Sequence, residues 1–266
     1  MKLGAYQFAV SGNIQENLNI IKNAIAEAAE QKIELLVFPE CALTGYPPHD
    51  IPDSNAVDFA EVNTALEEIH TLAADSGICA VVGSITQGEP HGKPRNSAVI
   101  FLPDGKREIY HKRALWGWDK DNFSPGNAGG VFQLGNMRIG VRICFEVRFP
   151  EYFRELYAQN TDLDIILFYD VADRDDTDRY DLIRSHIRTR AVENVCPILT
   201  VDAIKPYQTA PTALYDRSGG TLIELERNKE GLLVCDWEKT ELTFGEEGRR
   251  SFSNDLLGVP FRELPR

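Results

Sequence analysis

The sequence predicts an α/β fold in which helices and sheets pack as layers. Apolar residues recur at helical spacing in several long segments, and short apolar runs with the length of strands separate these segments. Two dipeptides, Asp104-Gly105 and Gly135-Asn136, lie between apolar runs and are typical of hairpin turns. The hairpins imply mixed sheets. Four layers, in the order helix, sheet, sheet and helix, would accommodate this many strands.

Four segments have the periodicity of helices. The first follows the turn Ser11-Gly12-Asn13, and the periodicity of the second stops at Gly77. The third begins at Pro150, and the fourth follows the acidic run 173–178. We expect these helices over residues 14–31, 56–76, 150–159 and 178–195.

Short apolar runs predict the strands. Residues 34–38 have the length of a buried strand and end at Pro39-Glu40, and each hairpin signal joins a pair of such runs. No repeat, low-complexity tract or linker interrupts the pattern, so we expect one domain over residues 1–266. The expected strands cover residues 3–10, 34–38, 78–85, 97–102, 106–112, 132–134, 137–143, 164–168, 198–201, 213–215, 221–225 and 232–235.

Composition and charge exclude several classes of function. The 266 residues include 41 acidic and 28 basic side chains, a net charge of −13, whereas recognition of nucleic acid needs a surplus of Lys and Arg. No apolar run approaches the roughly 20 residues of a transmembrane helix, and the first residues lack the pattern of a signal peptide. We therefore expect no nucleic-acid or membrane partner and a cytoplasmic location. The five scattered cysteines are interpreted as reduced thiols.

Common cofactor and metal motifs are absent from the sequence. Residues 88–93 approach a phosphate-binding loop but have the wrong spacing, and no dinucleotide-binding, nucleophile-elbow, zinc-protease or paired-cysteine motif occurs. The acidic run 173–178 lacks the glycine of a calcium loop and fits a solvated helix start better. The five histidines have no spacing suited to one metal. We expect no metal and no cofactor, and a cysteine paired with His111 or His186 stays open.

Three strand-like runs each deliver a reactive side chain at their ends. Glu40, Lys112 and Cys144 each follow such a run. Sites form at the ends of strands in open α/β sheets, because the connecting loops gather there. Together the three segments supply a carboxylate, an ammonium group and a thiol.

At these segments the chain resembles the nitrilase superfamily of carbon-nitrogen hydrolases, whose members carry a Glu-Lys-Cys triad on an αββα sandwich. The resemblance extends over essentially the whole chain, because the connecting pieces occur in the family order. These pieces are Asn96-Ser97-Ala98-Val99 and Asp104-Gly105 before the lysine, Phe123-Ser124-Pro125-Gly126 after it, and Arg190-Ala191-Val192-Glu193-Asn194 near the end of the late helix. The resemblance implies a four-layer αββα sandwich of the nitrilase type.

The resemblance also implies a role for each member of the triad. Cys144 matches the nucleophile, Glu40 the general base and Lys112 the cation beside the oxyanion. A free thiol with a pKa near 8.5 is mostly protonated at neutral pH, so it needs a base or a positive neighbour to react. The backbone N–H of Phe145 would stabilise the oxyanion. The other cysteines are interpreted as small core residues: Cys41, Cys79, Cys196 and Cys235.

Further positions are carried over from the same resemblance. Asp119 stands where the family usually has a second glutamate near the triad, so the carboxylate is kept but is shorter by one methylene. We expect it to act with the triad. Glu146, Arg148 and Glu193 are interpreted as ion-pair partners that support the site. Tyr46 and Trp116 are expected to line the substrate or oxyanion site.

The residues after Cys144 look like the amidase-type branches of the superfamily and unlike true nitrilases. We therefore expect hydrolysis of a small amide, of the omega-amidase or N-carbamoyl-amine type, through a cysteine thioester with release of ammonia. The alternatives are nitrile hydrolysis or acyl transfer on the same triad, and a non-catalytic scaffold of the same fold. Retention of all three triad residues argues against a scaffold, because a scaffold has no use for an activated thiol.

Two further expectations concern substrate charge and assembly. A neutral or cationic amide is favoured by acidic residues expected at the pocket mouth, namely Asp170, Asp173 and Asp175. Against this, Arg148 and Arg174 could bind a carboxylate. Proteins of this family commonly associate through helices beside the nucleophile, so we expect at least a homodimer, with residues 150–159 and 178–195 at its interface.

Overall fold

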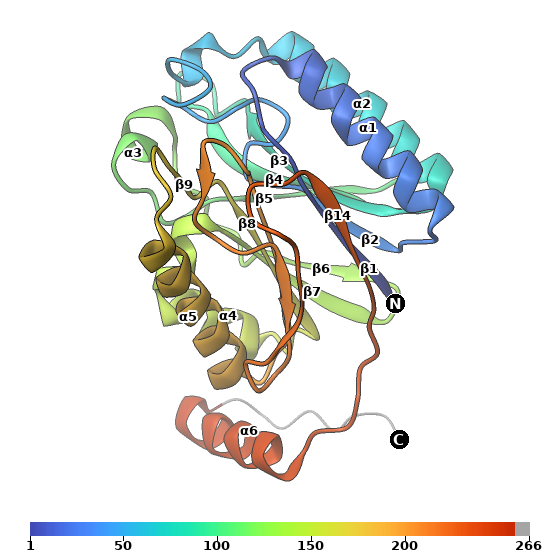
Figure 1. The fold of residues 1–266 in the computed structure, drawn as a ribbon, viewed down its shortest axis with the longest axis vertical. Coiled ribbons are helices and arrows are strands. Elements are labelled where there is room, and N and C mark those ends of the chain that lie inside the picture. The colour runs from blue at the N-terminus through green and yellow to red at the C-terminus, as the bar shows by residue number, and fades with distance from the viewer. Residues whose placement is uncertain (259–266) are drawn as a thin grey trace.

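The computed structural model describes residues 1–258 and has two six-stranded sheets between two pairs of helices (Figure 1). The helices are α1 (Ile14–Glu30), α2 (Phe59–Ser76), α3 (Trp118–Asn122), α4 (Pro150–Ala158), α5 (Thr177–Asn194) and α6 (Phe244–Leu257). The strands are β1 (Lys2–Gln7), β2 (Leu35–Val37), β3 (Cys79–Thr86), β4 (Arg95–Phe101), β5 (Arg107–His111), β6 (Val131–Leu134), β7 (Met137–Ile143), β8 (Leu163–Phe168), β9 (Val171–Ala172), β10 (Ile198–Asp202), β11 (Tyr207–Gln208), β12 (Ala213–Tyr215), β13 (Thr221–Glu224) and β14 (Gly231–Asp236). The predicted αββα layering is confirmed.

The two large sheets have the same plan. The first has the strand order β14-β1-β2-β3-β4-β5, and the second has the order β13-β12-β10-β8-β7-β6. Three central strands are parallel in each sheet, β1 to β3 in the first and β7, β8 and β10 in the second. The outer strands pair antiparallel with them, as the hairpin signals indicated. Parallel strands bring their carboxyl ends to one edge of a sheet, and that edge is where sites form.

Three clusters of buried apolar side chains hold the layers together. Successive side chains of a strand point to opposite faces, so Leu35 and Val37 of β2 pack between the sheets while Leu36 packs toward α1 and α2. The third cluster joins α4 and α5 to the outer face of the second sheet and includes Phe153 and Ile187. Both sheets are therefore covered on both faces, and each fully buried large side chain contributes about 1.5–3 kcal/mol.

The predicted helices and strands are all present, with shifts at their ends. The second helix begins at Phe59 because the Asp58 side chain caps it, accepting hydrogen bonds from the Ala60 and Glu61 N–H groups. The sequence patterns did not predict α3, α6, β9 or β11. The start of α6 could have been predicted from Thr243 and Glu246, which have the spacing of a capping box and form one in the structure.

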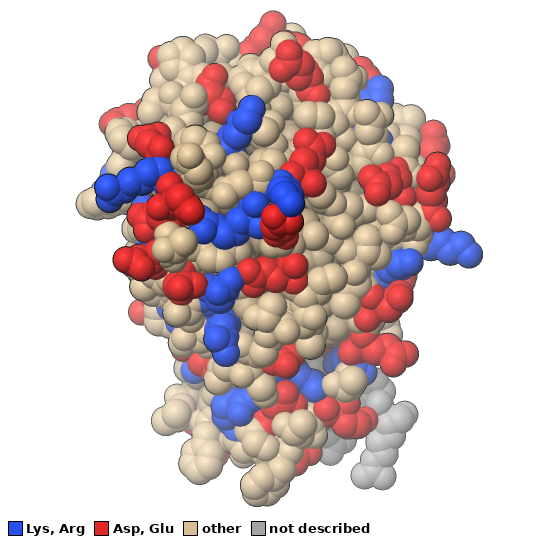
Figure 2. Space-filling model, in the orientation of Figure 1, with Lys and Arg blue, Asp and Glu red and all other residues tan. Residues whose placement is uncertain are grey.

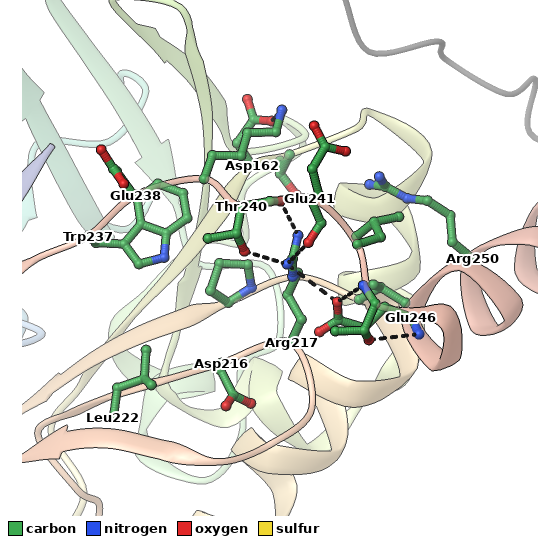
Figure 3. A pocket seen from close by; sticks show the side chains of 16 residues that line it. Asp162, Asp216, Arg217, Leu222, Trp237, Glu238, Thr240, Glu241, Glu246 and Arg250 are labelled. Carbon is green, nitrogen blue, oxygen red and sulfur yellow. Dashed lines mark hydrogen bonds and ion pairs between the residues drawn. The ribbon is translucent and has the colours of Figure 1, made fainter. Parts of the chain in front are cut away.

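After β14 the chain leads to α6, which lies below α4 and α5 in the view of Figure 1. Arg217 fixes this segment: its guanidinium donates to the Thr240 and Glu241 carbonyls at 3.0 and 2.9 Å and lies 3.3 Å from Glu246 Oε2 (Figure 3). This segment lines the hollow in Figure 3 together with Asp162, Asp216 and Leu222. The residues that line this hollow, within the described part of the chain, include none of the predicted active-site residues.

Two surface properties bear on possible partners. None of the helices within residues 1–258 has both the length and the apolar character required to cross a membrane. On the face drawn in Figure 2, basic side chains lie among acidic ones. That face therefore lacks the continuous basic patch that binds a phosphate backbone.

Candidate active site

The predicted triad lies where the two sheets meet. Glu40 follows β2, Lys112 directly follows β5, and Cys144 directly follows β7. The backbone connects the sheets here, because the Glu40 N–H donates to the Phe168 carbonyl at 3.2 Å and the Tyr169 N–H donates to Glu40 Oε2 at 2.9 Å. Phe168 ends β8, which pairs with the nucleophile strand β7. The carboxylate after one sheet is thus fixed by the other sheet.

Lys112 lies between two carboxylates. Its Nζ is 2.7 Å from Glu40 Oε1 and 2.7 Å from Asp119 Oδ2. The exposed fractions are 1% for Glu40, 2% for Lys112 and 3% for Asp119, so water screens these charges only weakly. Asp119, supplied by α3, reaches the lysine in spite of its shorter side chain.

Neutral donors complete the hydrogen bonding of both carboxylates. Asn96 Nδ2 donates to Glu40 Oε1 at 2.7 Å, and the Tyr46 hydroxyl donates to Asp119 Oδ1 at 2.8 Å. The Tyr46 ring stacks on Tyr169, with ring centroids 4.9 Å apart. Tyr46 was expected near the site, and the loop that begins at Tyr169 was expected to line the pocket, whereas Asn96 was not expected there. Tyr169 directly follows an apolar run, the same signal that located the triad.

A glycine allows the turn that carries Glu40 to lie directly on the first sheet. A Cβ at Gly83 would be 2.0 Å from the Pro39 carbonyl oxygen and 2.7 Å from Glu40 Cα. The Leu43 N–H donates to the Gly83 carbonyl at 3.0 Å. A side chain at position 83 would therefore displace the carboxylate from the lysine.

Cys144 occupies a restrained turn. It begins the short 3-10 helix 144–148 and has a φ of +45°, a value that costs energy in a residue with a Cβ. Glu146 restrains this turn, because its carboxylate accepts from the Ile143 and Arg113 N–H groups at 2.7 Å each and from the Tyr110 hydroxyl at 2.8 Å. The expectation that Glu146 is an ion-pair partner is wrong: its carboxylate binds backbone N–H groups because the turn leaves them without other acceptors.

The expectation for Arg148 is also wrong. Within residues 1–258 its guanidinium has no ion-pair partner, and its carbonyl accepts from Arg190 Nη2 at 3.3 Å. Arg190 pairs with Glu193 at 2.7 Å and also donates to the Val147 carbonyl at 2.9 Å. The helix α5 therefore supports the nucleophile turn through Arg190, which sequence spacing alone could not place against residue 147.

Burial and the neighbouring charges act in opposite directions on the pKa values of Glu40 and Lys112. Burial raises the pKa of Glu40, and Lys112 offsets only part of that rise. Burial alone would lower the pKa of Lys112, but Glu40 and Asp119 outweigh it and hold that pKa well above its ordinary value. Burial and the Glu40 charge raise the pKa of the Cys144 thiol. The site therefore holds a protonated lysine beside a neutral thiol and a carboxylate whose pKa is shifted toward neutrality.

Aromatic side chains form an open rim beside the nucleophile. Phe145 stacks on Trp116 with ring centroids 6.3 Å apart, and Phe149 meets Phe145 edge-on at 5.2 Å. These rings and Tyr152 line an open hollow. Trp116 is 65% exposed, so it lies at the outer edge of this rim and not in the buried centre.

The structure favours a carboxylate over a histidine as the partner of the thiol. His111 Nδ1 is 2.7 Å from Ser97 Oγ, and His186 lies on α5. No three His, Cys, Asp or Glu side chains within residues 1–258 are grouped as metal ligands. The charged groups that act on the Cys144 thiol include Glu40, Lys112, Asp170 and Asp119.

Comparison with known families settles the relationship. The family model described as carbon-nitrogen hydrolase matches residues 2–241. The chain belongs to the carbon-nitrogen hydrolase family. Omega-amidase NIT2 from Xenopus tropicalis is 31% identical over an alignment of 170 residues, and the match covers 59% of this chain and 59% of the relative. An (R)-stereoselective amidase from Pseudomonas sp is 30% identical over 170 residues, 62% of this chain and 59% of the relative. The chain thus spans 59% of the length of these curated relatives.

Solved structures of the family share the fold. An amidase from Nesterenkonia sp. has a TM-score of 0.79 and 25% identity, and the match covers 97% of this chain and 96% of the amidase. A mutant of the amidase from Nesterenkonia sp. AN1 carries the acetamide moiety of fluoroacetamide covalently added at its active-site cysteine. That mutant has a TM-score of 0.79 and 26% identity over 90% of each chain.

In the pH profile of Cys144 alkylation, the rate falls toward acidic pH. Replacing Asp119 with Asn should move the midpoint of this fall to lower pH. The Asp119 charge raises the pKa of Glu40, so its removal lowers that pKa and Glu40 stays a base at lower pH. The rate of Cys144 alkylation by iodoacetamide, measured by mass spectrometry as a function of pH, gives the midpoint. Asp121→Asn, an exposed position on the same helix, is the control. An unchanged midpoint in Asp119→Asn, or an equal shift in both variants, would contradict the assignment.

Proposed function

We propose that this protein hydrolyses the carbon–nitrogen bond of a small amide through a thioester on Cys144. One observation carries the proposal: a buried lysine held at 2.7 Å by each of two carboxylates, electrostatically coupled to a cysteine at a strand end. Family membership supports it, as do the amidase names of the relatives. Glu40, Lys112 and Cys144 are the proposed catalytic residues, and Asp119 is proposed to act with them.

The first step forms the thioester precursor. The raised pKa of Cys144 keeps the thiol protonated, so Glu40 takes its proton as the sulfur attacks the amide carbon. A carbon–sulfur bond forms, and the carbonyl electron pair moves to oxygen. Lys112 and the Phe145 backbone N–H stabilise that oxyanion, and the loss of one such donor costs about 3 kcal/mol in comparable sites.

The second step releases ammonia, and the third regenerates the thiol. The oxyanion collapses, the carbon–nitrogen bond breaks, and Glu40 returns its proton to the departing nitrogen. Water then attacks the thioester while Glu40 accepts its proton, the carbon–sulfur bond breaks, and the proton passes to the Cys144 sulfur. Lys112 stays protonated throughout because Asp119 remains beside it when Glu40 is neutral.

The proposal also concerns the chemical class of the amide substrate. We favour an omega-amide or an N-carbamoyl amine, as the residues after Cys144 indicate. Acyl transfer requires only that an amine replace water in the third step, and nitrile hydrolysis uses the same nucleophile, so both remain the alternative activities. A non-catalytic scaffold is disfavoured. Apolar residues would stabilise a scaffold at least as well as three buried ionised groups and a strained cysteine do.

Assembly and location belong to the same proposal. We infer at least a homodimer through α4 and α5, supported by two exposed apolar residues: Leu182 on α5 is 49% exposed, and Phe149, which precedes α4, is 38% exposed. A cytoplasmic location is supported by the five cysteines, which all lie in the described part of the chain and are all free.

Replacing Cys144 with Ala should abolish ammonia release from every amide tested while leaving thermal unfolding nearly unchanged, because only this thiol can form the thioester. The matched control is Cys196→Ala, a buried thiol 3.8 Å from Thr161 Oγ1, which should lower the melting temperature and keep the activity. Ammonia release across a panel of small amides, carbamoyl compounds and nitriles measures both. Turnover near the wild-type rate in Cys144→Ala would end the proposal.

Replacing Leu182 with Asp should dissociate the homodimer, because a charge would then be buried in the interface. Light scattering at micromolar concentration should give the wild type a mass above that of the monomer, 29.9 kDa. The variant should have the monomer mass. Phe252→Asp, on α6 and 73% exposed, should leave the assembly intact. A wild type found only at the monomer mass would refute the proposed assembly.

A further inference from the structure

An ion pair that the sequence did not predict lies beside the triad. Arg179 Nε is 2.6 Å from Asp170 Oδ1. Asp170 follows the end of β8 by two residues, and Arg179 is the third residue of α5. Asp175, also expected at the pocket mouth, pairs with Arg227 at 2.9 Å. Two of the three aspartates that favoured a cationic substrate are therefore neutralised by arginines.

The strand register places this pair near the nucleophile. In the second sheet β7 and β8 are parallel, with Ile143 paired to Leu167. Cys144 follows β7 and Asp170 follows β8, so both lie past the carboxyl edge of neighbouring strands. Between them in sequence, the Tyr169 N–H donates to Glu40 at 2.9 Å. The thiol, the general base and the ion pair thus share one edge.

Asp170 is fixed and buried. Its side chain is 7% exposed, and the Thr209 hydroxyl donates to its carboxylate. Its N–H donates to Asp202 Oδ1 at 2.9 Å, and Asp202 also accepts from the Ala210 N–H at 3.0 Å. The carboxylate therefore cannot turn toward a ligand, and it serves as an anchor for the arginine.

Arg179 is the member of the pair that faces outward. Its side chain is 45% exposed, and Asp170 engages only Nε. Within residues 1–258, Nη1 and Nη2 have no hydrogen-bond partner. The first turn of a helix disfavours a positive charge, because the helix dipole is positive there. The ion pair with Asp170 offsets this cost, and it leaves Nη1 and Nη2 available to a ligand.

We propose that Arg179 determines specificity by binding a carboxylate on the acyl chain of the amide substrate through its two Nη groups. A guanidinium presents paired donors that match a carboxylate, and Asp170 holds them in place. The substrate class is then a small amide that carries a second, anionic end. This inference rests on the proposed function for turnover, but the binding of the anion does not require turnover.

Alkylation of Cys144 by two reagents tests the inference directly. Iodoacetate and iodoacetamide react alike, with a carbon–sulfur bond formed and iodide lost, and they differ only in that iodoacetate carries a carboxylate. The ratio of the two rates, measured at Cys144 by mass spectrometry, cancels any change in ionisation of the thiol. We expect Arg179→Gln to lower the ratio of the iodoacetate rate to the iodoacetamide rate about tenfold, and salt to lower it in the wild type.

Two further variants make the result decisive. Arg174→Gln removes one exposed positive charge five residues away and should leave the ratio nearly unchanged. Asp170→Asn combined with Arg179→Gln leaves no unpaired buried carboxylate and no change in net charge, and it should still lower the ratio. An unchanged ratio in both Arg179 variants, or an equal fall in Arg174→Gln, would overturn the inference.

Turnover separates this inference from the proposed function. The values of kcat/KM for matched amides, with and without a terminal carboxylate, should show the same loss of preference in Arg179→Gln. Amide hydrolysis with an alkylation ratio insensitive to Arg179 would refute the anion site alone. A ratio that depends on Arg179, with no hydrolysis of any amide, would refute the proposed function and leave the anion site standing.

Discussion

The Lys112 ammonium group is buried between two buried carboxylates, and this ion-pair group fixes the geometry of the site. Lys112 contacts Glu40 and Asp119 at 2.7 Å each, and all three are almost inaccessible to water. Removing one member of a buried ion pair costs about 3–5 kcal/mol. The three segments that supply these side chains therefore hold one another in place. The excess negative charge of the trio also opposes ionisation of the Cys144 thiol, so proton transfer to Glu40 accompanies attack.

The αββα fold creates this arrangement by joining two sheets at their functional edges. Glu40 belongs to the first sheet, yet its carboxylate and its N–H are bound by the end of β8 in the second. Gly83 allows the close approach, because any Cβ there would meet the Pro39 carbonyl. Glu146 makes a second connection between the sheets, because its carboxylate accepts from Ile143 at the end of β7 and from Arg113, which follows Lys112 after β5. The packing of the two sheets thus places the catalytic side chains next to one another.

Local sequence patterns predicted the fold and the three strand-end residues, because apolar runs and their endpoints are local properties. They could not predict contacts that depend on how separate loops meet. Asn96 and Arg179 are of this kind, since each reaches a carboxylate far away in sequence or beyond a turn. Glu146 and Arg148 were expected to form ion pairs, but the Glu146 carboxylate binds backbone N–H groups and the Arg148 carbonyl accepts from Arg190. Spacing shows which residues lie near a turn and not what they bind there.

The state of Lys112 tests the account most directly, because burial and the two carboxylates oppose each other at this one group. NMR titration of protein labelled at its lysine side chains, with the Lys112 signal identified by its loss in Lys112→Arg, measures the pKa. The account predicts that Lys112 stays protonated to a pH above the ordinary lysine value of about 10.4. Deprotonation of Lys112 below that value would show that burial outweighs Glu40 and Asp119, and would contradict the account.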